Sequence, residues 1–392
     1  MADASPSDLR GAAPDRVRDA LRDGDPLPGG RGFAGRLADP PDRDGPVLVR
    51  DVLGRRPLFV ERAVADSVTE PAPTDRAPTD PDAWSFDRNA LDEPAPVPAG
   101  SVASAAGIER AWSLPDGPPA DPGPAQTAVD GAVADALGSL AGGPERLAVA
   151  FSGGVDSGLV AAGAPDAPCY VAGFGGCHDV AAAREAAAAM NRDLRVVEVT
   201  HEELLRAVRE VADATGRRNP MDLAIAVPLY LAAEAAAADG IDRLAVGQGA
   251  DELFGGYSKV VDPATDDRVD ADTVRGARTE TVRTLPDQLE RDVLALRAAG
   301  IEPVAPLLDD RVVAAALALP GELLASDGER KVALRRAATG RAPESVRTAD
   351  KKAVQYGTYV SRELDRLARR AGFKRRMDDH VGRYLDDLLA SD

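Results

Sequence analysis

The segment that most constrains the fold is LAVAFSGGVDSGLVAAG, residues 147–163. An apolar run of strand length leads into two glycines and then into an alanine-rich stretch of helical composition. Glycine lets the backbone adopt a positive φ and approach a ligand closely, and the free N–H groups at a helix start favour anions. The segment therefore predicts a strand, an anion-binding turn and a helix, in that order.

Three further apolar runs, CYVAGF, RVVEVT and DRLAVGQG, follow between long stretches of Ala, Leu and Arg. Strands that alternate with helices indicate a parallel sheet covered on both faces, with ligands beyond the carboxyl ends of the strands. After about residue 280 the pattern predicts helices alone. We therefore expect an α/β fold with a helical C-terminal part.

The first third of the chain has a different pattern. Short β-like pieces such as PVLVRDV and RPLFVER lie between Gly, Pro and Asp turns, and the tract at 71–82 is typical of an exposed loop. Residues 114–124, LPDGPPADPGP, have the composition of a linker. The 392 residues are enough for about two domains. We predict a β-rich domain over 1–113, a linker over 114–124 and the α/β domain over 125–392.

The composition is acidic, with 65 Asp and Glu against 47 Lys and Arg, a net charge of −18 and only five lysines. Such a surface suits a high-salt cytoplasm and argues against a nucleic-acid partner. The spacing of Cys169 and Cys177, the two cysteines of the sequence, fits neither a disulfide framework nor a zinc pair. The sequence begins without an apolar targeting segment and has no run of 18 apolar residues, which predicts a cytoplasmic protein that does not cross a membrane.

The turn Ser152-Gly153-Gly154-Val155-Asp156-Ser157 lacks the lysine of a Walker loop. Its serines offer hydroxyl donors, and Asp156 offers a hard oxygen to Mg²⁺. The turn resembles the S-G-G-x-D-S signature of the ATP pyrophosphatase superfamily, whose members split ATP between its α and β phosphates and adenylate a substrate. The resemblance implies ATP and Mg²⁺ as cofactors and a pyrophosphate-loop fold.

A second motif, VGQGADELFGGYSK at 246–259, resembles the G-E-G-A-D-E-L-F-G-G-Y segment of glutamine-dependent asparagine synthetases and their β-lactam synthetase relatives. The similarity continues through ERDVLALRAAGIEPVAPLLD at 290–309, and then through DGERKVALRRAA and RTADKKAVQYG. It implies that Asp251 joins Asp156 in holding Mg²⁺, and that Lys351 neutralises the leaving phosphates with Lys352 beside it.

The full site that this resemblance implies has a nucleotide part and a catalytic part. Nucleotide binding is expected at Ala150, Ser152, Gly153, Gly154, Asp156, Ser157, Ala172, Val246, Gly247 and Lys352. The catalytic set is Lys351, Gln248, Asp251 and Glu252.

The sequence departs from the family pattern in three places. Gln248 stands where the synthetases carry a Glu that accepts a proton from ammonia, and an amide cannot do so at neutral pH. Glu252 or water would then have to take the proton. Val293-Leu294 replace an Asp-Arg pair, and Val304 replaces an Arg. These lost charges concern the acceptor site, so they bear on whether aspartate is the substrate.

The front of the chain resembles a class II glutaminase domain of the Ntn type. RDVLGRRPLFVE at 50–61 is similar to two of its strands, and WSFDRNALDEPAPVPAGSV at 84–102 is similar to its end. That domain uses an N-terminal Cys as nucleophile, whereas this sequence begins Met1-Ala2 and has no Cys before Cys169. We expect a truncated domain that does not hydrolyse glutamine. It would serve as a structural cover, a homodimer contact or a docking face for a separate glutaminase.

The sequence therefore predicts an ATP-dependent ligase of the asparagine synthetase type. It would activate a carboxylate, aspartate by resemblance, as an acyl-adenylate and aminate it with free ammonia. Three alternatives stay open: amide or lactam formation on another carboxylate, a non-catalytic ATP-binding subunit, and RNA modification.

Overall fold

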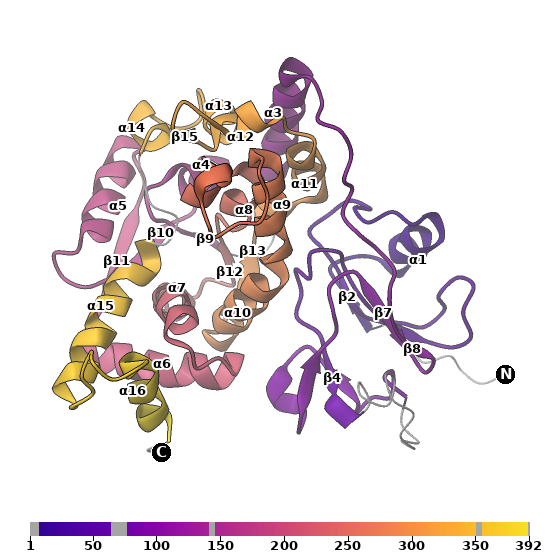
Figure 1. Cartoon of the computed structure of the whole chain (residues 1–392), viewed down its shortest axis with the longest axis horizontal. Coiled ribbons are helices and arrows are strands. Elements are labelled where there is room, and N and C mark those ends of the chain that lie inside the picture. The colour runs from indigo at the N-terminus through magenta and orange to yellow at the C-terminus, as the bar shows by residue number, and fades with distance from the viewer. Residues whose placement is uncertain (1–7, 64–76, 141–145, 350–354, 391–392) are drawn as a thin grey trace.

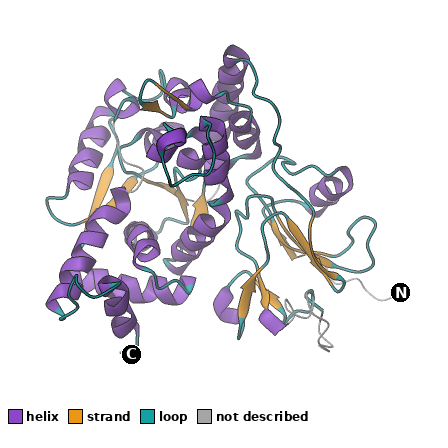
Figure 2. Cartoon of the chain, in the orientation of Figure 1, coloured by secondary structure: helices purple, strands orange, loops and turns teal. Residues whose placement is uncertain are grey.

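The computed structural model describes residues 8–63, 77–140, 146–349 and 355–390. Two sheet-containing parts lie side by side, a larger α/β part and a smaller β-rich part that includes the N-terminus (Figure 1, Figure 2). The predicted loop at 71–82 falls partly outside the described residues. The α/β and β-rich interpretations of the sequence are both confirmed.

The α/β part is built on a five-stranded sheet in the order β11-β10-β9-β12-β13, in which every pairing is parallel. Its strands are β9 Leu147–Ala150, β10 Cys169–Gly173, β11 Leu194–Glu198, β12 Arg243–Ala245 and β13 Glu302–Val304. The expectation of helices alone after residue 280 was wrong at β13 and also at two two-residue strands, Ala325–Ser326 and Glu329–Arg330. Strand β13 has three residues, one of them Pro303, which lacks an N–H group and is tolerated because β13 is an edge strand.

Helices cover both faces of this sheet. Side chains alternate along β9, where Val149 faces one core and Ala148 and Ala150 face the other, as the pleat of a strand requires. The helices on the first side are α3 Pro122–Gly138, α4 Val155–Gly163, α5 His178–Ala189, α11 Asp310–Leu317 and α13 Val332–Ala337. Those on the second side are α6 His201–Thr215, α7 Pro220–Ala238, α10 Leu285–Ala298, α15 Gln355–Arg370 and α16 His380–Leu389.

Short elements complete this part of the chain. They are α8 Ala250–Phe254, η2 Ser258–Val260, η3 Pro263–Thr265, α9 Val274–Arg283, η4 Pro306–Leu308, α12 Gly321–Leu324, the hairpin β14 Ala325–Ser326 and β15 Glu329–Arg330, and α14 Glu344–Arg347.

Helix α7 is apolar enough over its 19 residues to cross a membrane by length and composition, and it alone has this property among the described residues. Its most apolar window is 61% buried against the sheet and the neighbouring helices. Such burial is what a helix in a protein core shows, so the finding is weak evidence for a membrane span.

The β-rich part contains two antiparallel sheets, β1-β2-β3-β7-β8 and β5-β4-β6. Its elements are β1 Asp8–Arg10, α1 Pro14–Asp23, β2 Ala34–Leu37, β3 Val47–Arg50, β4 Phe59–Glu61, β5 Trp84–Ser85, η1 Arg88–Ala90, β6 Pro94–Pro96, β7 Ser101–Ser104 and β8 Gly107–Arg110. The following segment is extended until α3 starts at Pro122, so this helix begins inside the predicted linker.

A buried ion pair joins the two parts. Arg55 Nε lies 2.7 Å from Asp51 Oδ1, and its Nη1 lies 2.6 Å from Asp310 Oδ1 at the start of α11. Burial alone would lower the pKa of Arg55, but the two carboxylates outweigh it and raise that pKa. Gly29 N also donates to Asp310 Oδ2 at 2.9 Å. The β-rich part therefore supplies the charge partner of a buried carboxylate in the α/β part.

We predict that Arg55→Met lowers the free energy of unfolding by about 3–5 kcal/mol, because it leaves two buried carboxylates without a cation. Urea unfolding followed by circular dichroism measures this change. Arg22→Met is the matched control, since Arg22 pairs with Asp19 on the surface, with both side chains more than half exposed. Its effect should stay below about 1 kcal/mol. Equal effects of the two substitutions would contradict the prediction.

Candidate active site

The glycine-rich turn lies between β9 and α4, as the sequence predicts. Ser152 N and Ser152 Oγ each lie 3.2 Å from Ser157 Oγ, which draws the start of the turn onto the first turn of the helix. Gly153 has a φ of +76°, and a Cβ there would stand 2.9 Å from the carbonyl oxygen of Ala182 in α5. A larger residue therefore fits neither the conformation nor the space.

The second motif packs directly against this turn. Val246 and Gly247 follow β12, which is the neighbour of β9 in the sheet. A Cβ on Gly247 would lie 2.9 Å from the Cβ of Asp156 and 3.2 Å from Ser157 N. The two predicted motifs thus meet at the carboxyl ends of adjacent parallel strands, the position at which such sheets bind ligands.

Lys331 stands between the two predicted metal-binding aspartates. Its Nζ lies 2.6 Å from Asp156 Oδ2 and 2.7 Å from Asp251 Oδ1, and the residue is only 8% exposed. Burial would lower the pKa of Lys331, but the two carboxylates outweigh burial and raise it. Lys331 has a φ of +58°, a left-handed conformation that is uncommon for a residue other than glycine. Such backbone strain gathers at functional sites.

Tight packing around this triad leaves room for glycine alone at position 256. A Cβ there would come within 2.4 Å of Lys331 Cε and would also overlap the carboxylate of Asp251. Sequence reasoning did not select Lys331. The available signal was its place in DGERKVALRRAA, a stretch of the family resemblance, in a chain with only five lysines.

The donors present fit Mg²⁺ that also binds phosphate. Asp156 Oδ1 is buried and has no hydrogen-bond partner. Among the described residues no group of three or more His, Cys, Asp or Glu comes together as a protein-only metal cage. Mg²⁺ commonly takes one or two carboxylates and completes its shell with substrate phosphates and water. Asp156 and Asp251 would be the protein ligands in that arrangement.

Glu252 is buried beside this cluster. Tyr257 Oη donates to Glu252 Oε1 at 2.5 Å. Burial, with the nearby negative charge of Asp251, raises the pKa of Glu252 from 4.5 to about 7. A carboxyl group with that pKa gains and loses its proton near neutral pH, which is the property required of a general base.

Gln248 follows Gly247, and its side-chain amide contacts helix α10. Its Nε2 donates to Asp292 Oδ2 at 2.6 Å. Asp292 also accepts hydrogen bonds from Arg291, which in turn reaches Asp222 Oδ1 at 2.9 Å. The amide is thereby fixed by a partly buried network, and Gln248 lines a cavity that is separate from the loop at Ser152.

The positions expected to contact adenosine are clustered. Ala150, Ala172 and Val246 lie at or just after the ends of β9, β10 and β12, and all three belong to one buried core. A small, mainly apolar hollow opens beside Ala172 between Pro228 of α7 and Val360 of α15.

The two lysines expected to neutralise pyrophosphate, Lys351 and Lys352, lie outside the described residues. The chain just before them is anchored by α13, because Arg335 donates to the carbonyl oxygens of Arg347 and Ala349. Burial raises the pKa of Asp156 above its ordinary value, and the positive charges of Lys331 and, to a smaller extent, Arg335 oppose this rise.

Comparisons with known proteins identify the family to which the chain belongs. The family model described as asparagine synthase matches residues 128–280 and 265–387. The chain belongs to the asparagine synthase family. A curated protein of Methanocaldococcus jannaschii, whose name describes a glutamine-hydrolyzing asparagine synthetase, is 28% identical over 281 residues. That match covers 63% of this chain and 51% of the relative, so the chain spans about half of the relative's length.

One solved structure with a weak overall similarity is the U34-tRNA thiolase NcsA from Methanococcus maripaludis with its [4Fe-4S] cluster. The match covers 69% of this asparagine synthase family member and 81% of the thiolase, at 11% identity and a TM-score of 0.29. No functional argument rests on it.

We predict that the free energy of unfolding falls as the pH rises, because Glu252 loses its proton. Its folded pKa of about 7 exceeds the ordinary value of 4.5, so the folded protein holds the proton more tightly than the unfolded chain. The contribution of Glu252 to stability is therefore intact below about pH 4.5 and is lost as the pH rises toward 7. The loss should be about 2–3 kcal/mol.

Unfolding in urea at pH 5 and pH 8 tests the direction of this pH dependence. Glu252→Gln should be close to wild type at pH 5 and clearly more stable than wild type at pH 8. The control is Glu322→Gln, which changes an exposed glutamate in the first turn of α12. A difference between wild type and Glu252→Gln that stays constant with pH would rule out the shifted carboxyl.

Proposed function

We propose that this member of the asparagine synthase family activates a carboxylate with ATP, releases pyrophosphate and transfers the acyl group from AMP to ammonia. The observation that carries the proposal is the convergence of the Ser152–Ser157 turn, Asp251 and Lys331 at the carboxyl ends of β9 and β12. Family membership supports ATP-dependent amidation in general, while the acceptor, the nitrogen donor and the site roles below are our proposals.

In this proposal the turn binds the phosphates of ATP. The backbone N–H groups at the start of α4 and the hydroxyl groups of Ser152 and Ser157 point into the loop that Gly153 allows to close. Lys331 neutralises negative charge as pyrophosphate leaves, and Lys351 would add to it. Mg²⁺, when bound by Asp156 and Asp251, would supply further charge neutralisation on the phosphates. The protein thus contributes positioning and electrostatic stabilisation.

Glu252 is the group we propose for the proton that ammonia loses on attack. Gln248 cannot take it, because an amide is not a base at neutral pH and its Nε2 is already engaged by Asp292. The raised pKa of Glu252, about 7, suits the task, and Tyr257 orients its carboxyl group. In the described structure Glu252 is buried, so a bound water between it and the reacting nitrogen completes the proposed path.

The proposed nitrogen donor is free ammonia, and aspartate is the first acceptor to test. Cys169 and Cys177 are both buried in the α/β part, one in β10 and the other at the start of α5, and neither lies in the β-rich part. Another carboxylate is the second candidate acceptor. It is favoured by one observation: Gln248, Val293 and Val304, three departures from the family sequence, line the same cavity.

The deciding experiment measures AMP and pyrophosphate release from Mg·ATP by the full chain over a series of KCl concentrations. Aspartate is offered with ammonium or with glutamine. We expect AMP with ammonium and none with glutamine alone. AMP release with glutamine, accompanied by glutamate, would overturn the nitrogen assignment. If folded protein that binds ATP forms no AMP with any aspartate mixture, the acceptor is not aspartate.

Lys331→Met should lower the rate of AMP release by about 10²–10³-fold, because it removes charge stabilisation from the leaving phosphates. Lys374→Met is the matched control, since Lys374 is exposed in the turn between α15 and α16. Circular dichroism must show that both variants are folded. A Lys331→Met protein that is folded and retains wild-type turnover would remove Lys331 from the proposed site.

A further inference from the structure

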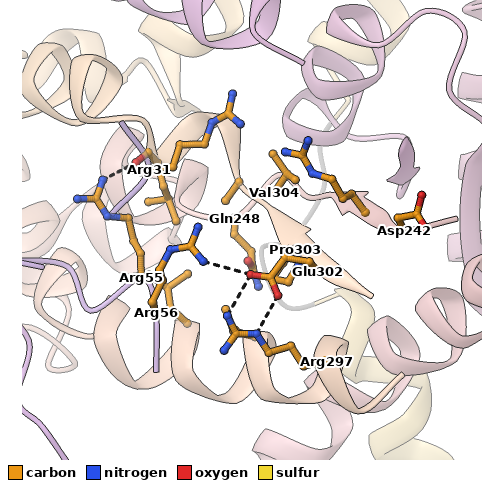
Figure 3. Close-up of a pocket in the computed structure, with 14 residues that line it drawn as sticks. Arg31, Arg55, Arg56, Asp242, Gln248, Arg297, Glu302, Pro303 and Val304 are labelled. Atoms are coloured by element: carbon orange, nitrogen blue, oxygen red, sulfur yellow. Dashed lines mark hydrogen bonds and ion pairs between the residues drawn. The ribbon is translucent and has the colours of Figure 1, made fainter. Parts of the chain in front are cut away.

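A cavity of about 470 Å³ lies between the two parts of the molecule, on the outer side of edge strand β13 (Figure 3). Helix α10 and β13 form one wall, and Arg31, Arg55 and Arg56 of the β-rich part form the other. This volume is within the range of about 300–1,000 Å³ that is usual for small-molecule pockets. No residue of the loop 152–157 lines this cavity, whereas Gln248, Val293 and Val304 do.

The cavity wall is rich in arginine although the chain is strongly acidic. Five arginines line it, against the two carboxylates of Asp242 and Glu302. They are Arg31, Arg55, Arg56, Arg243 and Arg297. In a chain with a net charge of −18, this gathering of guanidinium groups is a local concentration of positive charge, of which Arg55 is already paired with Asp51 and Asp310.

The internal ion pairs do not use all of the hydrogen-bonding capacity of these arginines. Glu302 lies between Arg56 and Arg297, with nitrogen–oxygen distances of 3.2 and 2.9 Å (Figure 3). Four of the arginines nevertheless keep one buried guanidinium nitrogen without a hydrogen-bond partner, namely Arg31, Arg55, Arg56 and Arg297. A buried donor without an acceptor destabilises the folded protein. An anion in the cavity would supply acceptors to these guanidinium groups once they reorient toward it.

Among these arginines, Arg31 has the least compensation for its buried positive charge. Burial lowers its pKa, and the like charges of Arg243 and Arg311 lower it further, against the opposing effect of Asp309. Its Nη2 contacts only uncharged acceptors, Ser139 Oγ and the carbonyl oxygen of Ala136. A carboxylate or phosphate in the cavity would supply the counter-charge that this site lacks.

Apart from the charged residues and Gln248, the remaining lining is apolar. Leu289, Val293 and Val304 form this surface. Gln248 lines the same cavity and directly follows Gly247, whose backbone packs on Asp156. A molecule in the cavity therefore contacts arginines at one end, apolar side chains along its length and, at Gln248, the residue next to the phosphate-binding loop.

We propose that this cavity binds the acceptor acid, and that the acceptor carries a second anionic group, a carboxylate or a phosphate, on an apolar body larger than that of aspartate. The arginines hold the second anionic group, while the first carboxylate lies toward Gln248 for activation. This inference rests on the proposed function for its reaction, and on the cavity alone for its binding chemistry.

Binding is tested first, without turnover, by titration calorimetry on the full chain at fixed low KCl. The probes are isophthalate, benzoate, aspartate and inorganic phosphate. Isophthalate should bind at least about 10-fold more tightly than benzoate or aspartate, because only it combines two carboxylates with a ring. Phosphate should compete with isophthalate, since both need the arginine end. Isophthalate binding that is no tighter than benzoate binding would overturn the proposal.

Substitutions of Arg31 test whether isophthalate binds in this cavity. Arg31→Gln should weaken isophthalate binding at least about 10-fold, while Arg31→Lys, which keeps the charge, should stay within a few-fold of wild type. Arg22→Gln, on the exposed face of α1, is the control and should bind as wild type does. The unfolding midpoint of each variant is measured in parallel. If Arg31→Gln is folded and binds isophthalate as tightly as wild type, the cavity is not the site.

Turnover separates this inference from the proposed function. AMP release supported by isophthalate, with a KM that rises in Arg31→Gln, would support both. AMP release with aspartate that Arg31→Gln leaves unchanged, together with no isophthalate binding, would overturn the cavity assignment and keep the ligase. Arg31-dependent isophthalate binding without AMP from any acid would instead overturn the ligase, and with it the role of the anion as acceptor.

Discussion

The ammonium group of Lys331 is the interaction on which the rest of the site depends. It joins Asp156 at the start of α4 to Asp251 in α8, and it extends from the residue that starts α13. Two carboxylates buried this close together would otherwise repel one another and drive one of them to protonate. One cation thus holds together three segments that are far apart in the sequence. The left-handed backbone of Lys331 and the absence of a side chain at Gly256 are the steric conditions for that contact.

The sheet and its two loops could be predicted from the sequence because their signals are local. Apolar runs, glycines and helix starts within 147–163 and 243–259 specify strand, turn and helix with little help from distant residues. β13 escaped prediction because three residues that include a proline carry no strand periodicity, and only the exposed edge of β12 gives them a partner. Lys331 escaped for a related reason, since its partner Asp156 lies 175 positions away.

The role of each site residue was predicted from resemblance, and the roles stay predictions. What the structure adds is proximity: Asp156, Asp251 and Gly247 come together, whereas the amide of Gln248 donates to Asp292 of α10. The structure also gives a physical reason for the amide at 248. A glutamate in that place would put a second negative charge against Asp292, while the amide donates a hydrogen bond to it at 2.6 Å. Glutamine at position 248 is therefore more compatible with the carboxylate of Asp292 than glutamate would be.

The buried contact between Arg55 and Asp310 has a consequence for how this molecule can change over time. Asp310 and Glu290 of the α/β part both find guanidinium partners in the β-rich part, Arg55 and Arg50, and one continuous core runs through both. Removal of the β-rich part would expose that core and leave the buried carboxylate of Asp310 without its guanidinium partner. Selection can therefore retain these residues for their charges and packing alone, so the persistence of the region in evolution is no measure of the chemistry it performs.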